Sequence, residues 1–271
     1  MPGNPMRTDV HTHAFHPAVA GKALARLVAL GFSPSGTGVV DDLLLRAAAA
    51  GLDRVVVHSL AVTGNQTPPA NTFALALARR EKTHPAEPEV MAFGSIHPDY
   101  PRWREELDRL ERAGIKGIKV HPNFQNMAFD DPRMFALMDA VEKRFRVMCH
   151  VGCEKPLEAN PASPYKLRTL IERFPDVTII AAHMGGYADG EAALDALAGT
   201  SVWLDTSGTA AMGSDALRRI VARHPADRVL FGSDYPLYDP AREREEQPER
   251  LGISAQDMET ILHNADRLLA A

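Results

Sequence analysis

Short apolar runs of strand character alternate with longer segments of helical period along almost the whole chain. The runs predict eight strands, over residues 7–11, 54–58, 90–96, 117–121, 146–150, 177–182, 201–205 and 228–232. The segments between them predict helices over residues 41–50, 71–82, 101–113, 132–144, 164–174, 191–198 and 215–223, with a last helix over 254–269. Eight strands that are each followed by a helix predict an α/β fold, a single (β/α)8 TIM barrel.

The length agrees with one barrel. The chain has 271 residues, close to the ~250 residues of a typical barrel, and it contains no linker, so we expect a single domain over residues 1–271. Two segments interrupt the alternation. Residues 14–40 predict a short helix over 18–30 and then a loop rich in glycine, serine and proline, and the charged residues 237–253 predict a solvated loop or helix.

The composition excludes several classes of protein. With 45% hydrophobic and 24% charged residues, the chain is globular rather than disordered. It has no apolar run near the ~20 residues of a membrane span, and residues 1–8 lack the apolar core of a signal peptide, so we expect no membrane and a cytoplasmic location. A net charge of −5 argues against nucleic acid as a partner. The only cysteines, Cys149 and Cys153, are too few for a disulfide framework and lack the paired spacing of a structural zinc site.

Polar residues recur at the ends of the predicted strands, and from His13 onward they are 22 to 45 residues apart. They are His11, His13, His58, His97, His121, His150, His183, Asp205 and Asp234. Seven of the eleven histidines fall at this one place in the repeat, which a random scatter of core histidines would not produce. Since the carboxyl ends of the strands meet at the face of a barrel that carries the active site, we expect these side chains to gather there.

The pair His11 and His13 is the most informative part of this pattern. Side chains at positions i and i+2 of a strand point to the same side, so both imidazoles can enter the barrel mouth and bind one cation. The alternative is a pair of ordinary surface histidines. The histidines at later strand ends favour the metal site.

Three further strand ends complete the expected site. If His150 faces inward, alternation turns Cys149 toward the helices as a small buried apolar residue, and His150 is then the third metal ligand. His183 follows an apolar run and precedes Gly185 and Gly186, and it is expected to contact a ligand or take part in catalysis. Asp234 offers a hard oxygen ligand that can also move a proton; the alternative is a helix N-cap.

These motifs resemble the amidohydrolase superfamily, and most closely its branch of metal-dependent hydrolases related to aminocarboxymuconate-semialdehyde decarboxylase. The residues that carry the resemblance are Asp9-Val10-His11-Thr12-His13, Gly117-Ile118-Lys119-Val120-His121-Pro122, Cys149-His150-Val151-Gly152, Ala182-His183-Met184-Gly185-Gly186 and Phe231-Gly232-Ser233-Asp234-Tyr235-Pro236. The resemblance implies one divalent ion bound by His11, His13, His150 and Asp234. It also implies His183 as a catalytic base or a further ligand.

Lys119 and three histidines have open roles. In two-metal members of the superfamily a lysine on the fourth strand is carbamylated and bridges the ions, and Lys119 and His121 share one face of that strand. The favoured alternative is that Lys119 pairs with Asp9, Asp234 or a substrate carboxylate. His58 and His97 could contact substrate or a second metal, as could Lys119 and His121. Each could equally be a strand-end residue with a structural hydrogen bond.

An ion held by three imidazoles and one carboxylate keeps a position open for water and lowers the pKa of that water to ~7. We therefore expect a hydrolase that acts on a C–N or C–O bond of a small molecule, such as an amide, a lactone or an ester. Asp234 and His183 are the catalytic residues of this hypothesis. Zinc is the first expectation, and manganese or iron would also fit.

Other functions stay open at this point. The same site could serve a nonoxidative decarboxylase of a small unsaturated or aromatic carboxylate, and a catalytically silent metal-binding barrel is an alternative of another class. A metal-dependent nuclease would need a glutamate where this chain has Lys119. A homodimer is a possible assembly. Residues expected to line the substrate site are Phe124, Gln125, Asn126, Tyr187, Trp203, Tyr235 and Tyr238.

Overall fold

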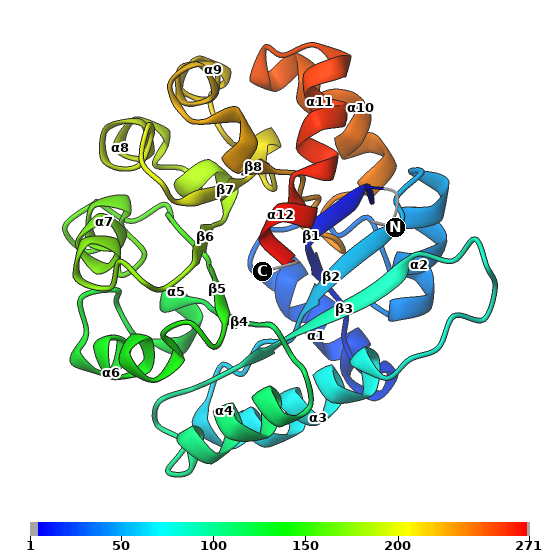
Figure 1. Ribbon diagram of the computed structural model, residues 1–271, viewed down its shortest axis with the longest axis vertical. Coiled ribbons are helices and arrows are strands. Elements are labelled where there is room, and N and C mark those ends of the chain that lie inside the picture. The colour runs from blue at the N-terminus through cyan, green and yellow to red at the C-terminus, as the bar shows by residue number, and fades with distance from the viewer. Residues whose placement is uncertain (1–4, 270–271) are drawn as a thin grey trace.

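The computed structural model describes residues 5–269 of the chain (Figure 1). Eight parallel strands follow one another around a single sheet in sequence order, which confirms the predicted TIM barrel. They are β1 (Thr8–His13), β2 (Arg54–His58), β3 (Glu89–Ser95), β4 (Gly117–Val120), β5 (Arg146–Cys149), β6 (Ile179–Ala181), β7 (Trp203–Asp205) and β8 (Val229–Leu230).

Backbone hydrogen bonds join the first strand to the residues after the last. The amide of Val10 donates to the carbonyl of Phe231 at 2.9 Å, and the amide of His13 donates to the carbonyl of Tyr235 at 2.7 Å. Between them, the amide of Asp234 donates to the carbonyl of His11 at 2.8 Å. These bonds close the barrel, so there is no free sheet edge at this seam.

Most helices lie around the outside of the barrel, and the last one packs against the barrel interior (Figure 1). They are α1 (Pro17–Ala29), α2 (Val40–Ala49), α3 (Thr67–Ala78), α4 (Trp103–Arg112), α5 (Pro122–Gln125), α6 (Pro132–Val141), α7 (Pro164–Arg173), α8 (Gly190–Ala196), α9 (Ser214–Arg223), α10 (Pro240–Leu251), α11 (Ala255–His263) and α12 (Ala265–Leu269). Single 3-10 turns are η1 (Gly64–Gln66), η2 (His183–Gly185), η3 (Thr209–Ala211) and η4 (Ala226–Arg228). Within the described residues, none of these helices combines the length and apolar character that crossing a bilayer requires.

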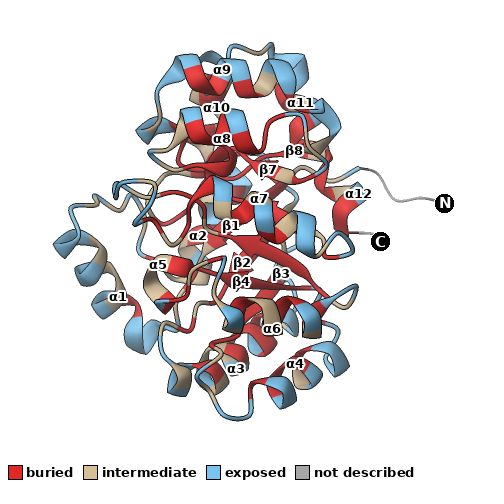
Figure 2. Cartoon of the chain, turned by 90° about the vertical axis from the view of Figure 1, so that its left-hand side faces the viewer, coloured by how far each residue is buried: buried red, intermediate tan, exposed pale blue. Residues whose placement is uncertain are grey.

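Two apolar layers form the core. One lies between the strands and the surrounding helices, and the other fills the barrel interior, as the buried strands of Figure 2 indicate. The interior layer includes Val56, Phe93, Met148 and Ile180, and it also contains Leu268 of α12. Because inward and outward residues alternate along each strand, these inward residues set the direction of the polar residues at the strand ends.

The elements differ from the sequence prediction mainly at their ends. β1 extends to His13, so both histidines of the pair belong to the strand. The last predicted helix is divided at Asn264, whose side-chain amide donates to the carbonyls of Ala226 (2.9 Å) before β8 and of Val229 (2.8 Å), the first residue of β8. A side chain that binds another segment's backbone takes the place of a continuous helix at this point.

The charged segment 237–253 is largely helix α10, and its inner face is buried. Gln247 is fully buried, and its side-chain amide donates to the carbonyls of Thr206 (3.1 Å) and Gly232 (3.0 Å) after β7 and β8. Its carbonyl accepts from the hydroxyl of Thr206 at 2.6 Å. This one side chain therefore ties α10 to two loops at the barrel mouth.

We expect Gln247→Ala to lower the free energy of unfolding by about 2–4 kcal/mol, because it leaves two buried carbonyls and a hydroxyl without partners. Gln256→Ala, at an exposed position of α11, is the matched control and should stay within about 0.5 kcal/mol of the wild type. Urea denaturation followed by circular dichroism measures both. Equal stabilities of the two variants would contradict this role of Gln247.

Candidate metal centre

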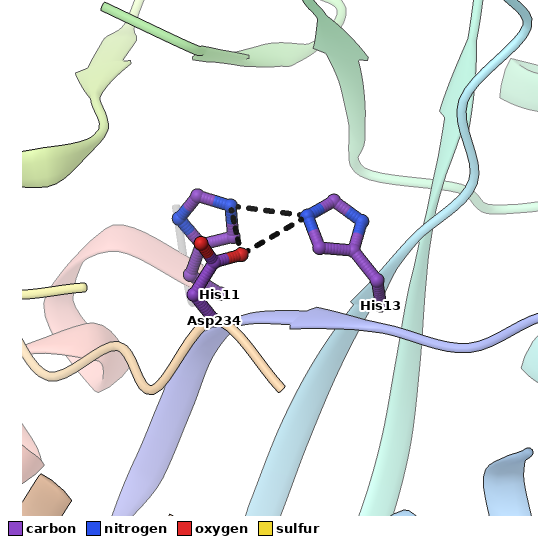
Figure 3. Close-up of side chains that lie close together, drawn as sticks. All are labelled: His11, His13 and Asp234. Atoms are coloured by element: carbon purple, nitrogen blue, oxygen red, sulfur yellow. Dashed lines mark hydrogen bonds and ion pairs between the residues drawn. The ribbon is translucent and has the colours of Figure 1, made fainter. Parts of the chain in front are cut away.

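His11, His13 and Asp234 converge at the mouth of the barrel (Figure 3). The Nε2 atoms of the two histidines are 3.3 Å apart. Asp234 Oδ1 lies 3.6 Å from Nε2 of His11 and 3.5 Å from Nε2 of His13. His11 is only 1% exposed, and His13 and Asp234 remain partly accessible from the mouth. The geometry thus brings together three of the four predicted ligands.

The hydrogen bonds behind the two rings assign their tautomers. Nδ1 of His11 lies 2.9 Å from a carboxylate oxygen of Asp205, and Nδ1 of His13 lies 3.3 Å from the backbone carbonyl of His58. Both Nδ1 atoms must donate to these acceptors, so each Nε2 carries a lone pair. The two lone pairs and the Asp234 carboxylate therefore face one another, and three acceptors in this arrangement fit a divalent cation.

The backbone at Asp234 is in the left-handed region, with φ 63°, which costs free energy for a residue other than glycine. The bond from its amide to the carbonyl of His11 holds it there. Burial alone would raise the pKa of Asp234, but the imidazoles of His11 and His13 lower this pKa to about 2. The carboxylate is therefore ionised at neutral pH and available as a ligand.

Lys119 is buried, and its Nζ lies 3.0 Å from Nε2 of His11. Burial lowers the pKa of Lys119 to about 8, although Asp205 and Asp234 act in the opposite direction. Within the described part of the chain, neither Asp9 nor Asp234 forms an ion pair with it. The Lys119 ammonium group instead donates to the lone pair that His11 offers to a cation, so the lysine reaches the centre of the site.

His183 and His150 form a second group beside the first. Nδ1 of His183 lies 3.0 Å from the hydroxyl and 3.2 Å from the carbonyl of Ser207, so it donates there. Nε2 of His183 then accepts from Nδ1 of His150 at 3.0 Å. Burial lowers the pKa of both imidazoles, which keeps them neutral at pH 7. His150 keeps its Nε2 for another partner, and its role as a third ligand stays a prediction.

His11, His183 and Asp205 also lie close enough together to suggest a second metal site. The hydroxyl of Ser207 occupies the space between them, 2.8 Å from Nδ1 of His11 and 3.0 Å from Nδ1 of His183, and it donates to Asp205. This group is therefore a hydrogen-bond network that orients two rings. It leaves no room for an ion of its own.

The remaining predicted residues lie around this centre in different ways. His58 is buried and donates from Nε2 to the carbonyl of Val10 at 2.8 Å. His97 accepts from the amide of Asp99 at 3.3 Å, which gives it a turn-forming contact. His121 stacks against the ring of His150. Their predicted contacts with a substrate or a second metal stay predictions.

The residues expected to line the substrate site divide into two groups. Trp203 begins β7, at the opposite end of the strand from the mouth, and its ring lies against Arg228. Gln125 is buried and donates to the carbonyls of Ala61 and Ile96. These two predictions are wrong, because strand position and backbone bonding fix both side chains elsewhere.

Tyr235 is also buried, and its hydroxyl donates to Asp42 at 2.7 Å, so its placement in the substrate site is wrong as well. Tyr187 does lie at the mouth, with its ring 5.6 Å from that of His183.

Comparison with known proteins gives the family. Residues 8–270 match the family model Amidohydro_2, amidohydrolase. The chain belongs to the amidohydrolase family. No match was found among proteins of curated function. Family membership makes the chain an amidohydrolase-family enzyme, and it favours catalysis over a silent metal-binding barrel.

Solved structures share the amidohydrolase barrel at low sequence identity. A 2,6-dihydroxybenzoate decarboxylase is 19% identical with a TM-score of 0.68, and the match covers 98% of this chain and 99% of that one. A proposed 2-pyrone-4,6-dicarboxylic acid hydrolase from Pseudomonas putida is 18% identical with a TM-score of 0.66, covering 99% and 98%. A 5-carboxyvanillate decarboxylase from Novosphingobium aromaticivorans with bound manganese is 16% identical with a TM-score of 0.67, covering 99% and 98%.

The sequence predicts no role for Asp205 or Ser207 in this amidohydrolase-family chain. Asp205 is a polar residue at a strand end, but spacing along the sequence does not reveal its pairing with His11. Ser207 follows two residues later, and nothing in its sequence context indicated that its hydroxyl bridges His11 and His183. The periodic position of Asp205 was the one available indication.

We expect Asp205→Asn to weaken Zn²⁺ binding by about 10–100-fold, because a neutral amide holds the Nδ1–H tautomer of His11 less firmly. Asp215→Asn is the matched control, since the side chain of Asp215 on α9 is 88% exposed. Competition titration with a chromogenic chelator measures both affinities. Unchanged affinity of the Asp205 variant would contradict the orienting role.

Proposed function

We propose that the protein is a metal-dependent hydrolase that cleaves a C–N or C–O bond of a small amide, lactone or ester. The convergence of two imidazole lone pairs and one ionised carboxylate carries this proposal. His11, His13 and Asp234 would hold one divalent ion, with His150 as the further ligand. The ion supplies Lewis-acid activation of water when bound. Zinc is our first choice, and manganese, which a similar barrel binds, is the second.

Asp234 and His183 would handle the protons and the substrate. The contacts of Asp234 with His11 and His13 are made by Oδ1, and within residues 5–269 Oδ2 has no hydrogen bond, so Oδ2 can accept a proton from water and pass it to the leaving group. His183 is kept neutral by burial and fixed at Nδ1 by Ser207. Its Nε2, which accepts a hydrogen bond from Nδ1 of His150, carries the lone pair that would orient the substrate or accept a proton once His150 releases it.

Decarboxylation of a small carboxylate is the second candidate function. The buried ammonium of Lys119 beside His11 supports it, because a buried cation attracts a carboxylate. Four of the similar barrels are decarboxylases by name, which agrees with this alternative. In either reaction we expect a small-molecule substrate. A cytoplasmic location and a homodimer remain expectations.

Metal analysis and a substrate screen test the proposal together. After reconstitution we expect about one ion per chain, and His11→Ala combined with His13→Ala should abolish binding, since two of the ligands are lost. The screen compares lactones, amides and aromatic carboxylates. Turnover of a lactone or amide supports hydrolysis, whereas release of carbon dioxide from a carboxylate favours the alternative. Two ions per chain with a carbamate on Lys119 would contradict the one-metal site.

We expect Asp234→Asn to keep much of the metal but lower kcat by ~10²-fold or more, because the amide cannot carry the proton. Asp215→Asn again serves as the control for loss of one acidic charge, since it is far outside the strand-end cluster on α9. Near-normal kcat in the Asp234 variant would reduce this residue to a ligand only.

A further inference from the structure

Three aromatic rings stack face to face at the ends of β4 and β5. The ring of His121 lies between those of Phe124 and His150, with centroids 4.0 Å and 3.8 Å apart and interplanar angles of 17° and 9°. β4 and β5 are parallel, with Val120 opposite Cys149, so their register brings His121 beside His150. The stack is therefore a consequence of strand pairing in this part of the barrel.

The backbone under His121 is firmly held. Its amide donates to the side-chain carbonyl of Gln125 at 2.9 Å, and the amide group of Gln125 donates to the carbonyls of Ala61 and Ile96. His121 is only 8% exposed. Its ring thus has little freedom to turn toward a substrate or an ion.

The nitrogens of His121 do not take part in the network that joins the other strand-end histidines. Its Nδ1 is buried and has no hydrogen-bond partner among the described residues. By contrast, Nδ1 of His150 donates to Nε2 of His183 at 3.0 Å. His121 contacts the site through the face of its ring.

The stacking geometry also argues against His121 and His150 as joint ligands of one ion. An imidazole binds a metal along a lone pair that lies in the plane of its ring, at about 2.0–2.1 Å. Two nearly parallel rings with centroids 3.8 Å apart have lone pairs in separate, parallel planes. No single ion can lie in both planes at that distance.

We propose that His121 is a positioning residue whose ring fixes the plane of the His150 ring, and through the His150–His183 hydrogen bond also fixes His183. A stacked neighbour restricts rotation of the His150 ring. Because His150 is only partly buried, its ring would otherwise be free to rotate out of the 3.0 Å hydrogen bond with His183. The inference rests on the proposed function only where it assigns His150 and His183 to the reaction. It predicts that a flat ring is required at position 121 and that its nitrogens are not.

His121→Phe and His121→Ala separate ring from nitrogen, and His224→Phe is the matched control. His224 is 4% exposed and also has an unpartnered Nδ1, but it ends α9 and bonds to the carbonyl of Val202 before β7. The first measurement is the NMR spectrum of the imidazole nitrogens in the metal-free chain labelled with ¹⁵N-histidine. His150→Gln assigns the His150 resonances.

We expect the His150 and His183 resonances to be preserved in His121→Phe and in the control, and to lose their hydrogen-bonded shifts in His121→Ala. Zn²⁺ titration should give a dissociation constant within about 3-fold of the wild type for His121→Phe and a weakening of about 10-fold or more for His121→Ala. Thermal unfolding of His121→Phe should occur at the wild-type Tm or above, because a buried nitrogen without a partner is removed.

Two results would overturn the positioning role: equal damage in the phenylalanine and alanine variants, or no change in either. If His121→Ala does not fold, Phe124→Ala removes the outer ring of the stack, and its His150 resonances should shift in the same direction. Unchanged resonances in that variant would also overturn the role. A wild-type chain that binds no Zn²⁺ would contradict the proposed function, while the comparison of metal-free spectra would still decide the inference.

Discussion

The backbone bonds between β1 and residues 231–235 are the contacts on which the site depends. The amide of Asp234 donates to the carbonyl of His11, and the amide of His13 donates to the carbonyl of Tyr235. They close the barrel and place the Asp234 carboxylate beside the imidazoles from the other end of the chain. They also help to hold Asp234 in a left-handed conformation that is unfavourable for an isolated aspartate. The same backbone hydrogen bonds therefore close the barrel and bring the three acceptors together.

Burial and neighbouring groups together give this acceptor group its chemistry. Burial lowers the pKa of His11 and His183 and so keeps their rings neutral, whereas Asp234 is ionised despite its burial. The site therefore holds lone pairs and a negative charge in a place with little water. Such a group needs a cation, because unpaired buried acceptors are costly. The ammonium of Lys119 contacts His11 and supplies part of the positive charge that these acceptors require. A lysine in this place must move or lose its proton when another cation binds to Nε2 of His11.

Periodicity predicted the barrel and the face on which the polar residues gather, because inward positions recur once in each strand and helix unit. It could not predict directions set by turns. Ile180 of β6 and Ala182 just after it take the inward positions, and the left-handed backbone at His183 and Met184 turns His183 back toward the site. Periodicity also could not predict which polar side chains bond to one another. The hydrogen bond between Asp205 and His11 joins β7 to β1, and no spacing in the sequence indicates it.

Five of the strand-end histidines differ in which part of the ring makes the contact that matters at the site. His11 and His13 present lone pairs to the centre, while the carbonyl of His58 and the carboxylate of Asp205 fix their tautomers from behind. His183 and His150 are joined by a nitrogen-to-nitrogen bond, and His121 supports His150 with its face. A ring such as that of His11 or His13, held at Nδ1, can offer only Nε2 to an ion. This explains why a site with few ligands is surrounded by so many imidazoles. Each supporting group excludes a ring orientation in which the ligand nitrogen would point away from the ion.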